Sequence, residues 1–545
     1  MVLAPARDPD AKAGWHDLSG NQLPRVMTSA VKDAVGWLPL VSEPPDRFHS
    51  QVVVIMLVGS LSSDSVPADL VYFRDGGRNL VVNPEIGAWQ ILDGCEIDVL
   101  RRLANGHSFG GDERDRIERI LARLVMTRLI YLPGRRPELR QVDAPLKLVY
   151  YAITDGCNLR CPYCYASSEK RLPGELDTRE SLDLIEQSAD MGAQTIIFTG
   201  GEPMLRRDLF EVARRVRELG MQANIITNAT LIRKPETARR IADTFAGVTV
   251  SIDGGTAKTH ERTRGAGTFV KTVDALRMLN TFGVRPMINH VVSEDNVGEL
   301  ADLSVLFADI DVAHVRLMHH SSLGRGAADD SSFGWSGYQT AHRFVWTDPR
   351  AQNLLPDGPL GQRSCDTKIN CGIGGNEIYV NSLGDVYPCK LVTERHHKVG
   401  NIRSTGLREL FGSPMLTDLR TSAVFAGDNL ADCRRCYIRG ACAGGCRAYH
   451  MAATGDLKRN SRALCRVLRH QMITSMWVAA GAGRDTVLSN EDEAFKPLMV
   501  ATGGVHPVYE DWKKEAALLA SSASTSPEQP PAYRRQLPVT AVRRT

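Results

Sequence analysis

Apolar and polar residues along the middle of the chain form blocks that predict strands alternating with helices. The run Leu148–Thr154 is almost wholly apolar or aromatic, which is typical of a buried strand. Further strands are predicted at Thr195–Thr199, Ala223–Thr227, Val248–Ile252, Pro286–Val292 and Val312–Met318. Helices are predicted after them at Arg206–Leu219, Pro235–Thr244, Phe269–Phe282 and Val297–Ala308. Six strands with crossover helices predict a parallel sheet that curls into a partial barrel.

A shorter pattern precedes the barrel. Strands are predicted at Gln51–Val58, Leu70–Phe73 and Asn79–Val82, and the last two form a hairpin across Asp75-Gly76-Gly77. Helices are predicted at Ile86–Leu103 and Asp112–Leu124, before an apolar end at Leu129–Leu132. This order predicts a winged-helix-like domain. Its second helix alternates acidic and basic residues, which is typical of a solvated face rather than of a DNA-binding one.

Length and charge narrow the classes of protein that need to be considered. A chain of 545 residues holds several domains, and we expect divisions at 1–50, 51–140, 145–345, 360–480 and 481–545. A net charge of +3 does not favour a nucleic-acid partner. The longest apolar run, Val52–Val58, is too short to cross a membrane, and no export signal begins the chain. We therefore expect a cytoplasmic protein with no membrane partner and a disordered tail from about Ala520.

Eleven of the twelve cysteines fall into tight groups, which in a reduced compartment favours thiolate ligation of metal. Cys157, Cys161 and Cys164 follow the first barrel strand. Three thiolates on a four-iron cluster leave one iron open to a small molecule, although a three-cysteine zinc site is the alternative. In barrels of this kind the active site lies at the C-terminal ends of the strands, where this loop is placed. Cys95 stands alone and is predicted to be a buried core thiol.

Gly200-Gly201-Glu202-Pro203 follows the second strand. Taken alone, this segment is a strand-to-helix turn, but the glycines also allow close approach of a ligand, and Glu202 can accept a hydrogen bond from an ammonium group. The cysteine loop with Tyr163, together with Gly-Gly-Glu-Pro, resembles the radical S-adenosylmethionine enzyme superfamily. Thr227-Asn228-Ala229 and Ser251-Ile252-Asp253-Gly254 support this resemblance.

The resemblance implies an α/β fold with a partial (β/α)6, TIM-like barrel and a set of cofactor ligands. The three loop cysteines would hold a [4Fe-4S] cluster that binds S-adenosyl-L-methionine. Gly200, Gly201 and Glu202 would bind the amino group of that cofactor, and Tyr163 would pack near its adenine. Ser251 and either Arg262 or Arg264 are further candidates for its carboxylate and ribose. The chemistry itself, hydrogen abstraction by a cofactor-derived radical, belongs to the cofactor.

The remaining eight grouped cysteines, with Gly384 before Cys389, resemble the SPASM extension of radical enzymes that act on peptides. By that resemblance one auxiliary cluster takes Cys365, Cys371, Cys389 and Cys446. A second takes Cys433, Cys436, Cys442 and Cys465. The prediction is three [4Fe-4S] clusters, and a pair of zinc ribbons is the alternative for the eight.

The N-terminal pattern is similar to the RiPP recognition element, which binds leader peptides by strand addition, and a purely structural cap is the alternative. The implied function is oxidative modification of a ribosomally made precursor peptide with its leader: a crosslink, an unsaturated bond or a decarboxylation. A flavodoxin or ferredoxin is the implied electron donor. A formylglycine-generating enzyme of the sulfatase-maturing type and a DNA-binding redox sensor are the rivals. No spacing identifies a catalytic base.

Overall fold

The computed structural model describes residues 59–110, 113–136, 145–328, 334–354, 371–421, 430–482, 494–511 and 514. The predicted strand at residues 51–58, the cysteine at 365 and the tail from residue 520 lie outside these ranges. Among the described residues, every helix is too short or too polar to cross a lipid bilayer.

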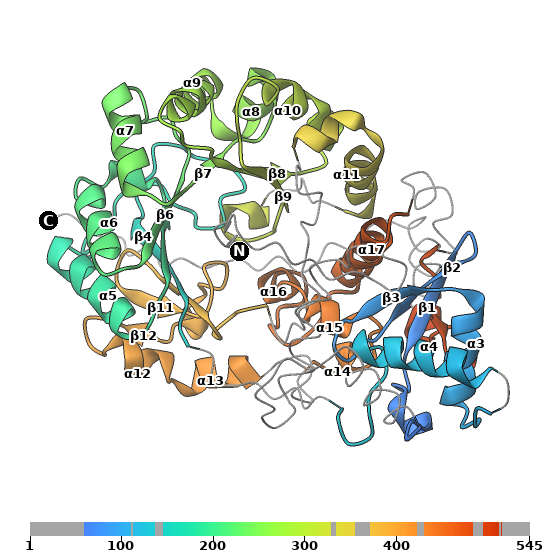
Figure 1. Cartoon of the computed structure of the whole chain (residues 1–545). Helices are drawn as coiled ribbons and strands as arrows, with labels where there is room; N and C mark the ends of the chain where they lie inside the picture. The colour runs from blue at the N-terminus through green and yellow to red at the C-terminus, as the bar shows by residue number, and fades with distance from the viewer. Residues whose placement is uncertain are drawn as a thin grey trace, which may run out of the picture.

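A nine-stranded sheet with the order β12-β11-β10-β4-β5-β6-β7-β8-β9 forms the barrel (Figure 1). Its parallel part consists of β4 (Leu148–Thr154), β5 (Thr195–Gly200), β6 (Gln222–Thr227), β7 (Gly247–Ser251), β8 (Met287–Val292) and β9 (His314–His319). All six predicted strands are therefore confirmed, each to within two residues at either end.

Helices cover the outer face of this sheet (Figure 1). They are α5 (Thr178–Asp190), α6 (Leu209–Glu218), α7 (Pro235–Thr244), α8 (Ala257–Arg264), α9 (Thr268–Thr281), α10 (Leu300–Leu306) and α11 (Trp335–Thr347). Alternate strand residues such as Phe198, Ile225 and Val250 are fully buried against them. The polar residues between these positions therefore face the interior of the barrel, because side chains alternate along a strand.

The region predicted to resemble the SPASM extension, described at residues 371–421 and 430–482 and called the SPASM part below, extends the same sheet. The strand β10 (Glu377–Val380) pairs in parallel with β4, and β11 (Asp385–Tyr387) and β12 (Gly400–Asn401) continue in antiparallel order. Its helices are α12 (Leu407–Phe411), α13 (Pro414–Thr421), α14 (Ala431–Arg434), α15 (Arg439–Cys442), α16 (Arg447–Thr454) and α17 (Arg462–Ala479). The auxiliary cysteines thus stand on elements that are continuous with the barrel.

The N-terminal domain holds a four-stranded sheet of order β13-β1-β2-β3. The predicted hairpin is confirmed as β1 (Val71–Asp75) and β2 (Arg78–Val82). The predicted helix at Ile86–Leu103 is wrong in its first half, because β3 (Trp89–Leu92) pairs with β2 before Asp93 caps α3 (Gly94–Ala104). The second helix is α4 (Arg114–Met126). The fourth strand, β13 (Leu498–Met499), comes from the C-terminal extension.

Each face of this small sheet is buried. Tyr72 and Val81 pack with α3 and α4, whereas Phe73 packs on the other side with Tyr437 and Trp477 of the SPASM part. The N-terminal and SPASM parts therefore share a core (Figure 1).

Cys95 does not lie in that core. It is exposed in the first turn of α3, so the prediction of a buried thiol is wrong. The helix turns Ile97 and Leu100 inward instead, and Cys95 falls on the opposite, solvated face.

Candidate active site

The loop after β4 brings its three cysteines to the C-terminal end of the barrel strands. The Cys157 amide donates to the Glu169 carbonyl at 3.1 Å, and the Cys164 amide donates to the Cys161 carbonyl at 3.3 Å. Arg325 Nε donates to the same Cys161 carbonyl at 3.0 Å. The loop is therefore closed by its own backbone and held from outside by Arg325.

The three thiols lie within electrostatic range of one another. Burial raises the pKa of Cys157 to about 11, and Glu202, Cys161 and Cys164 raise it further against one amide hydrogen bond. Thiols with raised pKa values bind metal with release of their protons, and the cation then stabilises the thiolates. Three thiols carried by one loop fit the ligand set of a four-iron cluster with one open iron.

Gly200 and Gly201 allow the end of β5 to lie in close contact with the backbone that leads into this loop. A Cβ on Gly201 would overlap the Gly156 carbonyl oxygen, and a Cβ on Gly200, whose φ is +128°, would overlap that of Thr154. The Gly201 amide donates to the Thr154 carbonyl at 2.9 Å. The sequence suggested that these glycines admit a ligand, and the structure shows that the chain's own backbone requires them as well.

Glu202 is 1% exposed and ties β5 to β6. Its carboxylate accepts from Thr227 Oγ1 at 2.7 Å and from the Asn228 amide at 2.8 Å. The Met204 amide donates to it at 3.1 Å. Burial raises the pKa of Glu202, and these hydrogen bonds oppose the rise. A carboxylate offers about four lone-pair positions, so one acceptor position remains for an ammonium group.

Asp253 and Arg264 are buried beside the cysteine loop and form a group with its half-buried Tyr163. Asp253 Oδ2 accepts from Arg264 Nε at 2.6 Å and from the Tyr163 hydroxyl. The Arg264 guanidinium also lies 5.8 Å from the centroid of the Tyr163 ring. Burial alone would raise the pKa of Asp253, but Arg264 holds it at about 2. Tyr163 and Arg264 are thus fixed together at the active end.

The two candidate arginines face different surroundings. Arg262 Nη1 donates to the Asp295 carbonyl at 2.8 Å on the solvent side, whereas Arg264 is buried against Asp253. Ser251 lies on the inner face of β7, paired in register with Asn289 of β8. Only Arg264 of the two therefore shares the interior with Tyr163.

Two residues that position the cysteine loop were missed by sequence reasoning. Glu175 is buried, and its carboxylate accepts from the Asp155 amide at 2.7 Å and from Thr154 Oγ1 at 3.0 Å. Arg325, 161 residues after Cys164, also donates to the Ser168 carbonyl at 2.9 Å. Glu175 lies in the loop before α5 and Arg325 in a short 3-10 helix, Gly324–Ala328, and no periodicity or motif singles out either residue.

The first set of SPASM thiols gathers around Cys389. Burial raises the pKa of Cys389, and Cys446 and Cys371 lie close enough to raise it further. The structure thus brings together three of the four expected ligands, and the fourth, at 365, lies outside the described residues.

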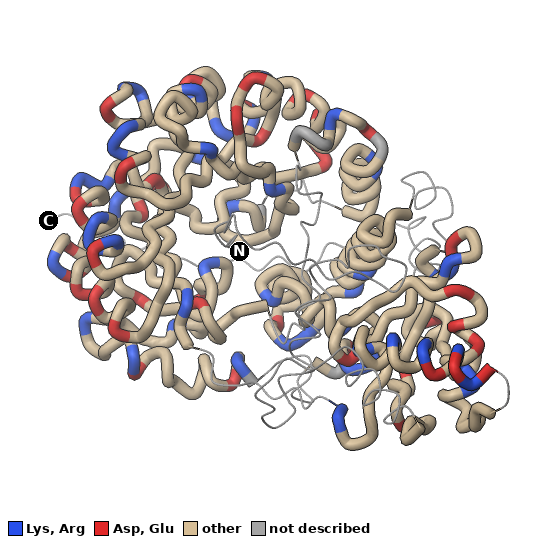
Figure 2. The backbone as a smooth tube through the Cα atoms, viewed as in Figure 1, with Lys and Arg blue, Asp and Glu red and all other residues tan. Residues whose placement is uncertain are grey.

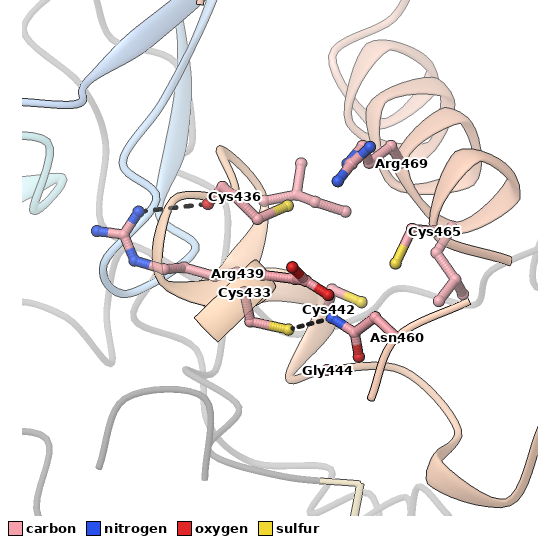
Figure 3. Close-up of a pocket in the computed structure, with 11 residues that line it drawn as sticks. Cys433, Cys436, Arg439, Cys442, Gly444, Asn460, Cys465 and Arg469 are labelled. Atoms are coloured by element: carbon pink, nitrogen blue, oxygen red, sulfur yellow. Dashed lines mark hydrogen bonds between the residues drawn. The ribbon is translucent and has the colours of Figure 1, made fainter. Parts of the chain in front are cut away.

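The second set lines one cavity, shown in Figure 3. Cys433, Cys436, Cys442 and Cys465 surround a partly open space of about 330 Å³, counting the solvent at its mouth. Asn460 Nδ2 donates to Cys433 Sγ at 3.0 Å. Within the described ranges, no three His, Cys, Asp or Glu side chains converge on a single metal ion. The four thiols instead surround a volume, and their chemistry fits a cluster ligated by four thiolates.

A partial barrel with three thiols at its C-terminal mouth and two further thiol groups defines an iron–sulfur enzyme. Residues 151–303 match the radical SAM superfamily, and residues 371–437 match the SPASM iron–sulfur cluster-binding domain. The chain is 31% identical over 317 residues to the mycofactocin maturase MftC of Mycobacterium ulcerans (strain Agy99), a match that covers 56% of this chain and 84% of that protein. It therefore belongs to the radical SAM superfamily, and it is a radical SAM enzyme with a SPASM domain.

Two further likenesses agree with this assignment. The AdoMet-dependent heme synthase of Methanosarcina barkeri (strain Fusaro / DSM 804) is 30% identical over 341 residues, covering 58% of this chain and 94% of that protein. The structure of native anSMEcpe with bound AdoMet superposes with a TM-score of 0.51 at 21% identity, over 64% of this chain and 100% of that one. The matches to the radical SAM and SPASM domains imply iron–sulfur clusters and S-adenosylmethionine as the cofactors of this enzyme.

Proposed function

We propose that this enzyme is a maturase that oxidatively modifies a ribosomally synthesised precursor peptide. The observation that carries the proposal is the position of the N-terminal domain, which contacts the loop bearing the second set of SPASM thiols. The Gly440 amide donates to the Pro84 carbonyl at 2.8 Å, and Arg439 pairs with Asp69. A domain so placed can hold a leader while the rest of the peptide reaches the barrel. The similarity to a mycofactocin maturase supports the same substrate class.

The ligand assignments are part of the proposal. Cys157, Cys161 and Cys164 hold the cluster that binds S-adenosylmethionine; Cys365, Cys371, Cys389 and Cys446 hold one auxiliary cluster, and Cys433, Cys436, Cys442 and Cys465 hold the other. When bound, cluster and cofactor together supply radical hydrogen abstraction. The protein's part is to bind, orient and exclude water.

The geometry of the barrel mouth supports the proposed cofactor-binding residues. Gly200 and Gly201 present backbone, and Glu202 presents a buried carboxylate, to the amino group of the methionine moiety. Tyr163 lies near the adenine, fixed by Asp253. Ser251, at the end of β7, and Arg264, at the end of α8, would bind the carboxylate and ribose.

The leader is proposed to add as a strand at the free edge of β3. The outer edge of β1 is already paired with β13, and in the described residues no strand pairs with the far side of β3. The Asn83 backbone amide donates to the Ala88 carbonyl, so these two residues form a hydrogen-bonded pair next to β3. Hydrogen-bonded and non-hydrogen-bonded pairs alternate along an antiparallel ladder. The backbone N–H and C=O groups of Trp89 and Ile91 therefore point away from β2, toward the outer edge of β3. Strand addition draws its affinity from such groups.

Net oxidation of the peptide is proposed because each auxiliary cluster would be bound by four thiolates and would have no open iron. A cluster with no open iron transfers electrons rather than binding substrate, and a substrate radical that loses an electron becomes oxidised. A flavodoxin or ferredoxin is the proposed external electron carrier. The product is therefore expected to lack two hydrogens, or carbon dioxide as well if the oxidation is a decarboxylation.

The test begins with short reading frames that neighbour the gene. Each encoded peptide is incubated anaerobically with enzyme, S-adenosylmethionine and reductant, and then weighed by mass spectrometry. Loss of two hydrogens with release of 5′-deoxyadenosine supports the proposal. A product of unchanged mass that carries solvent deuterium would show epimerisation instead. Conversion of a heme precursor or of a sulfatase cysteine, with no neighbouring peptide altered, would contradict the peptide assignment.

A further inference from the structure

The cysteine loop after β4 depends on contacts from outside itself. Its residues 157–168 form turns and bends rather than a helix or strand. The Cys164 and Ser167 amides donate to carbonyls within it, at 3.3 and 3.2 Å. Such local turns hold little of the backbone, and ordering the rest costs conformational entropy. The positions of the three thiols are therefore set largely by the segments that pack on the loop.

One such segment comes from the other end of the barrel. It begins at the end of β9 and comprises residues 319–326, which we call the strap. The Arg325 amide donates to the Cys164 carbonyl at 3.0 Å. The Arg325 guanidinium spans the loop, because Nε donates to the Cys161 carbonyl at 3.0 Å and Nη1 to the Ser168 carbonyl at 2.9 Å. The segment after the last parallel strand thus holds the loop after the first.

The guanidinium of Arg325 suits this task. Charged residues of the barrel gather on its outer helices, as Figure 2 shows. Arg325 is instead half-buried against the loop, where its N–H groups need acceptors, and the loop carbonyls provide them. A planar guanidinium reaches two carbonyls at once, whereas a lysine would carry the charge without that fork.

The strap and the loop also touch directly. A Cβ on Gly324, whose φ is +57°, would overlap the carbonyl oxygens of Cys164 and Tyr165. The His320 ring packs edge-on against Tyr163, with the ring centroids 6.1 Å apart. Packed backbone cannot turn aside as a flexible side chain can, so a shift of the strap shifts the loop as well.

The start of the strap contacts the first set of SPASM thiols through Tyr449. This tyrosine lies in the first turn of α16, three residues after Cys446, the N-cap of that helix. Its hydroxyl donates to the His319 carbonyl at 3.3 Å. Burial raises the pKa of Tyr449, and the thiols of Cys446 and Cys389 raise it further. A hydrogen bond with Ser321, also in the strap, opposes the rise. One side chain therefore links the first auxiliary set to the strap.

We propose that the strap couples the two cluster sites, so that a cluster in the first auxiliary set fixes the cysteine loop for binding of S-adenosylmethionine. Tyr449 and Arg325 act as positioning residues, since neither is among the proposed ligands. The proposal rests on the proposed ligand sets and not on the identity of the peptide. Its consequence is an order of assembly: the cofactor binds tightly once the proposed acceptor of the substrate's electron is in place.

Tyr449→Phe tests the link without removing a thiol. The anaerobically reconstituted variant should keep about twelve irons per chain. The cofactor-dependent change in its electron paramagnetic resonance spectrum should require about two- to tenfold more S-adenosylmethionine, because a hydrogen bond that holds the strap is lost. Amide hydrogens of residues 157–168 should exchange severalfold faster. Tyr72→Phe is the control: it removes a hydroxyl bound to Arg101 in the N-terminal sheet and should match wild type in both measurements.

Removal of either auxiliary cluster tests the coupling itself. Cys371→Ala should lower the iron content by about a third and speed exchange in the cysteine loop as Tyr449→Phe does. The two substitutions together should add little, because both act through one link. Cys433→Ala is the matched control, since it should remove as much iron from the second set and leave exchange in the loop unchanged.

Two substitutions of Arg325 separate hydrogen bonding from charge. Arg325→Lys and Arg325→Gln should both speed exchange in the loop and weaken cofactor binding, because both lose the fork that spans two carbonyls. Full rescue by lysine would show that the charge alone matters and would overturn the strap as a link.

The possible failures can be told apart. Wild-type exchange and cofactor binding in Y449F would overturn the coupling, and so would wild-type exchange in C371A once its loss of iron is confirmed. If C371A keeps all its iron, the ligand assignment is wrong, and Y449F still decides whether the strap acts. Neither measurement uses the peptide, so failure to find a modified peptide contradicts the proposed function and not the strap.

Discussion

Gly87 of the N-terminal domain lies directly against Gly440 of the SPASM part: a Cβ added to Gly87 would stand 2.7 Å from the Gly440 carbonyl carbon. Gly440 lies in α15 between Cys436 and Cys442, so this contact joins the N-terminal domain to the loop of the second auxiliary set. The domain is therefore part of the same packed unit rather than a detachable module.

Substitution of Gly440 by alanine should loosen this joint. The new Cβ would overlap the Gly87 backbone, which cannot turn aside as a flexible side chain could. Overpacking of this kind costs about 1–3 kcal/mol. Denaturant unfolding and limited proteolysis between residues 59 and 136 measure the loss. Gly94→Ala is the matched control, since a Cβ there meets open space, and its stability should equal or slightly exceed that of wild type.

Iron content tests the second thiol set. Three [4Fe-4S] clusters correspond to about twelve irons per chain. Cys433→Ala should lower this by about a third and remove one cubane signal from the electron paramagnetic resonance spectrum, because Cys433 lines the cavity with the other three thiols. Exposed Cys95 provides the control, and Cys95→Ser should retain all the iron. Unchanged iron in the Cys433 variant would contradict the ligand set.

Stability at low pH reports on the Asp253–Arg264 pair. The folded pKa of Asp253, about 2, lies below its usual value near 3.9. The carboxylate therefore contributes stability that is complete above about pH 4 and is lost as the pH falls toward 2. Arg264→Gln leaves the carboxylate buried and unpaired, which should cost about 3–5 kcal/mol near neutral pH.

Urea unfolding over a pH series measures how the free energy of unfolding changes with pH. The difference between wild type and R264Q should be largest near pH 7 and should narrow as Asp253 of the variant becomes protonated. Arg262→Gln, which removes a guanidinium on the solvent side, should cost much less at every pH. A pH-independent difference would show that Arg264 acts through packing and not through charge.

Much of the barrel was predictable because its strands are short apolar runs with helical patterns between them. Helix α5 also carried a signal that was overlooked, since Asp177 and Glu180 form a reciprocal capping box. The strand β3 was not predicted because its four residues lie almost directly before α3 and were included in the predicted helix. The strand β13 has two residues and pairs across more than 400 positions, and no local pattern encodes such a contact.

The residues of the candidate site also divide into those that the sequence predicted and those that it did not. The resemblance to the SPASM extension grouped four thiols that the structure places around one cavity. Glu175 and Arg325 escaped notice because they act through hydrogen bonds to loop backbone, which any sequence of suitable shape can receive.

Leader binding at β3 can be tested by removing one outward backbone donor. Ile91→Pro deletes an N–H on the free edge, where proline is tolerated, and should weaken peptide binding about tenfold while the domain stays folded. Gln90→Pro is the matched comparison, because its N–H faces β2 and its loss should disrupt the sheet itself. Fluorescence anisotropy of a labelled leader and circular dichroism of each variant separate the two effects. Deleting the whole N-terminal domain would not separate leader binding from folding, because the deletion would expose Trp477 and Tyr437 of the shared core. Equal leader affinity in wild type and I91P, with both folded, would contradict strand addition at this edge.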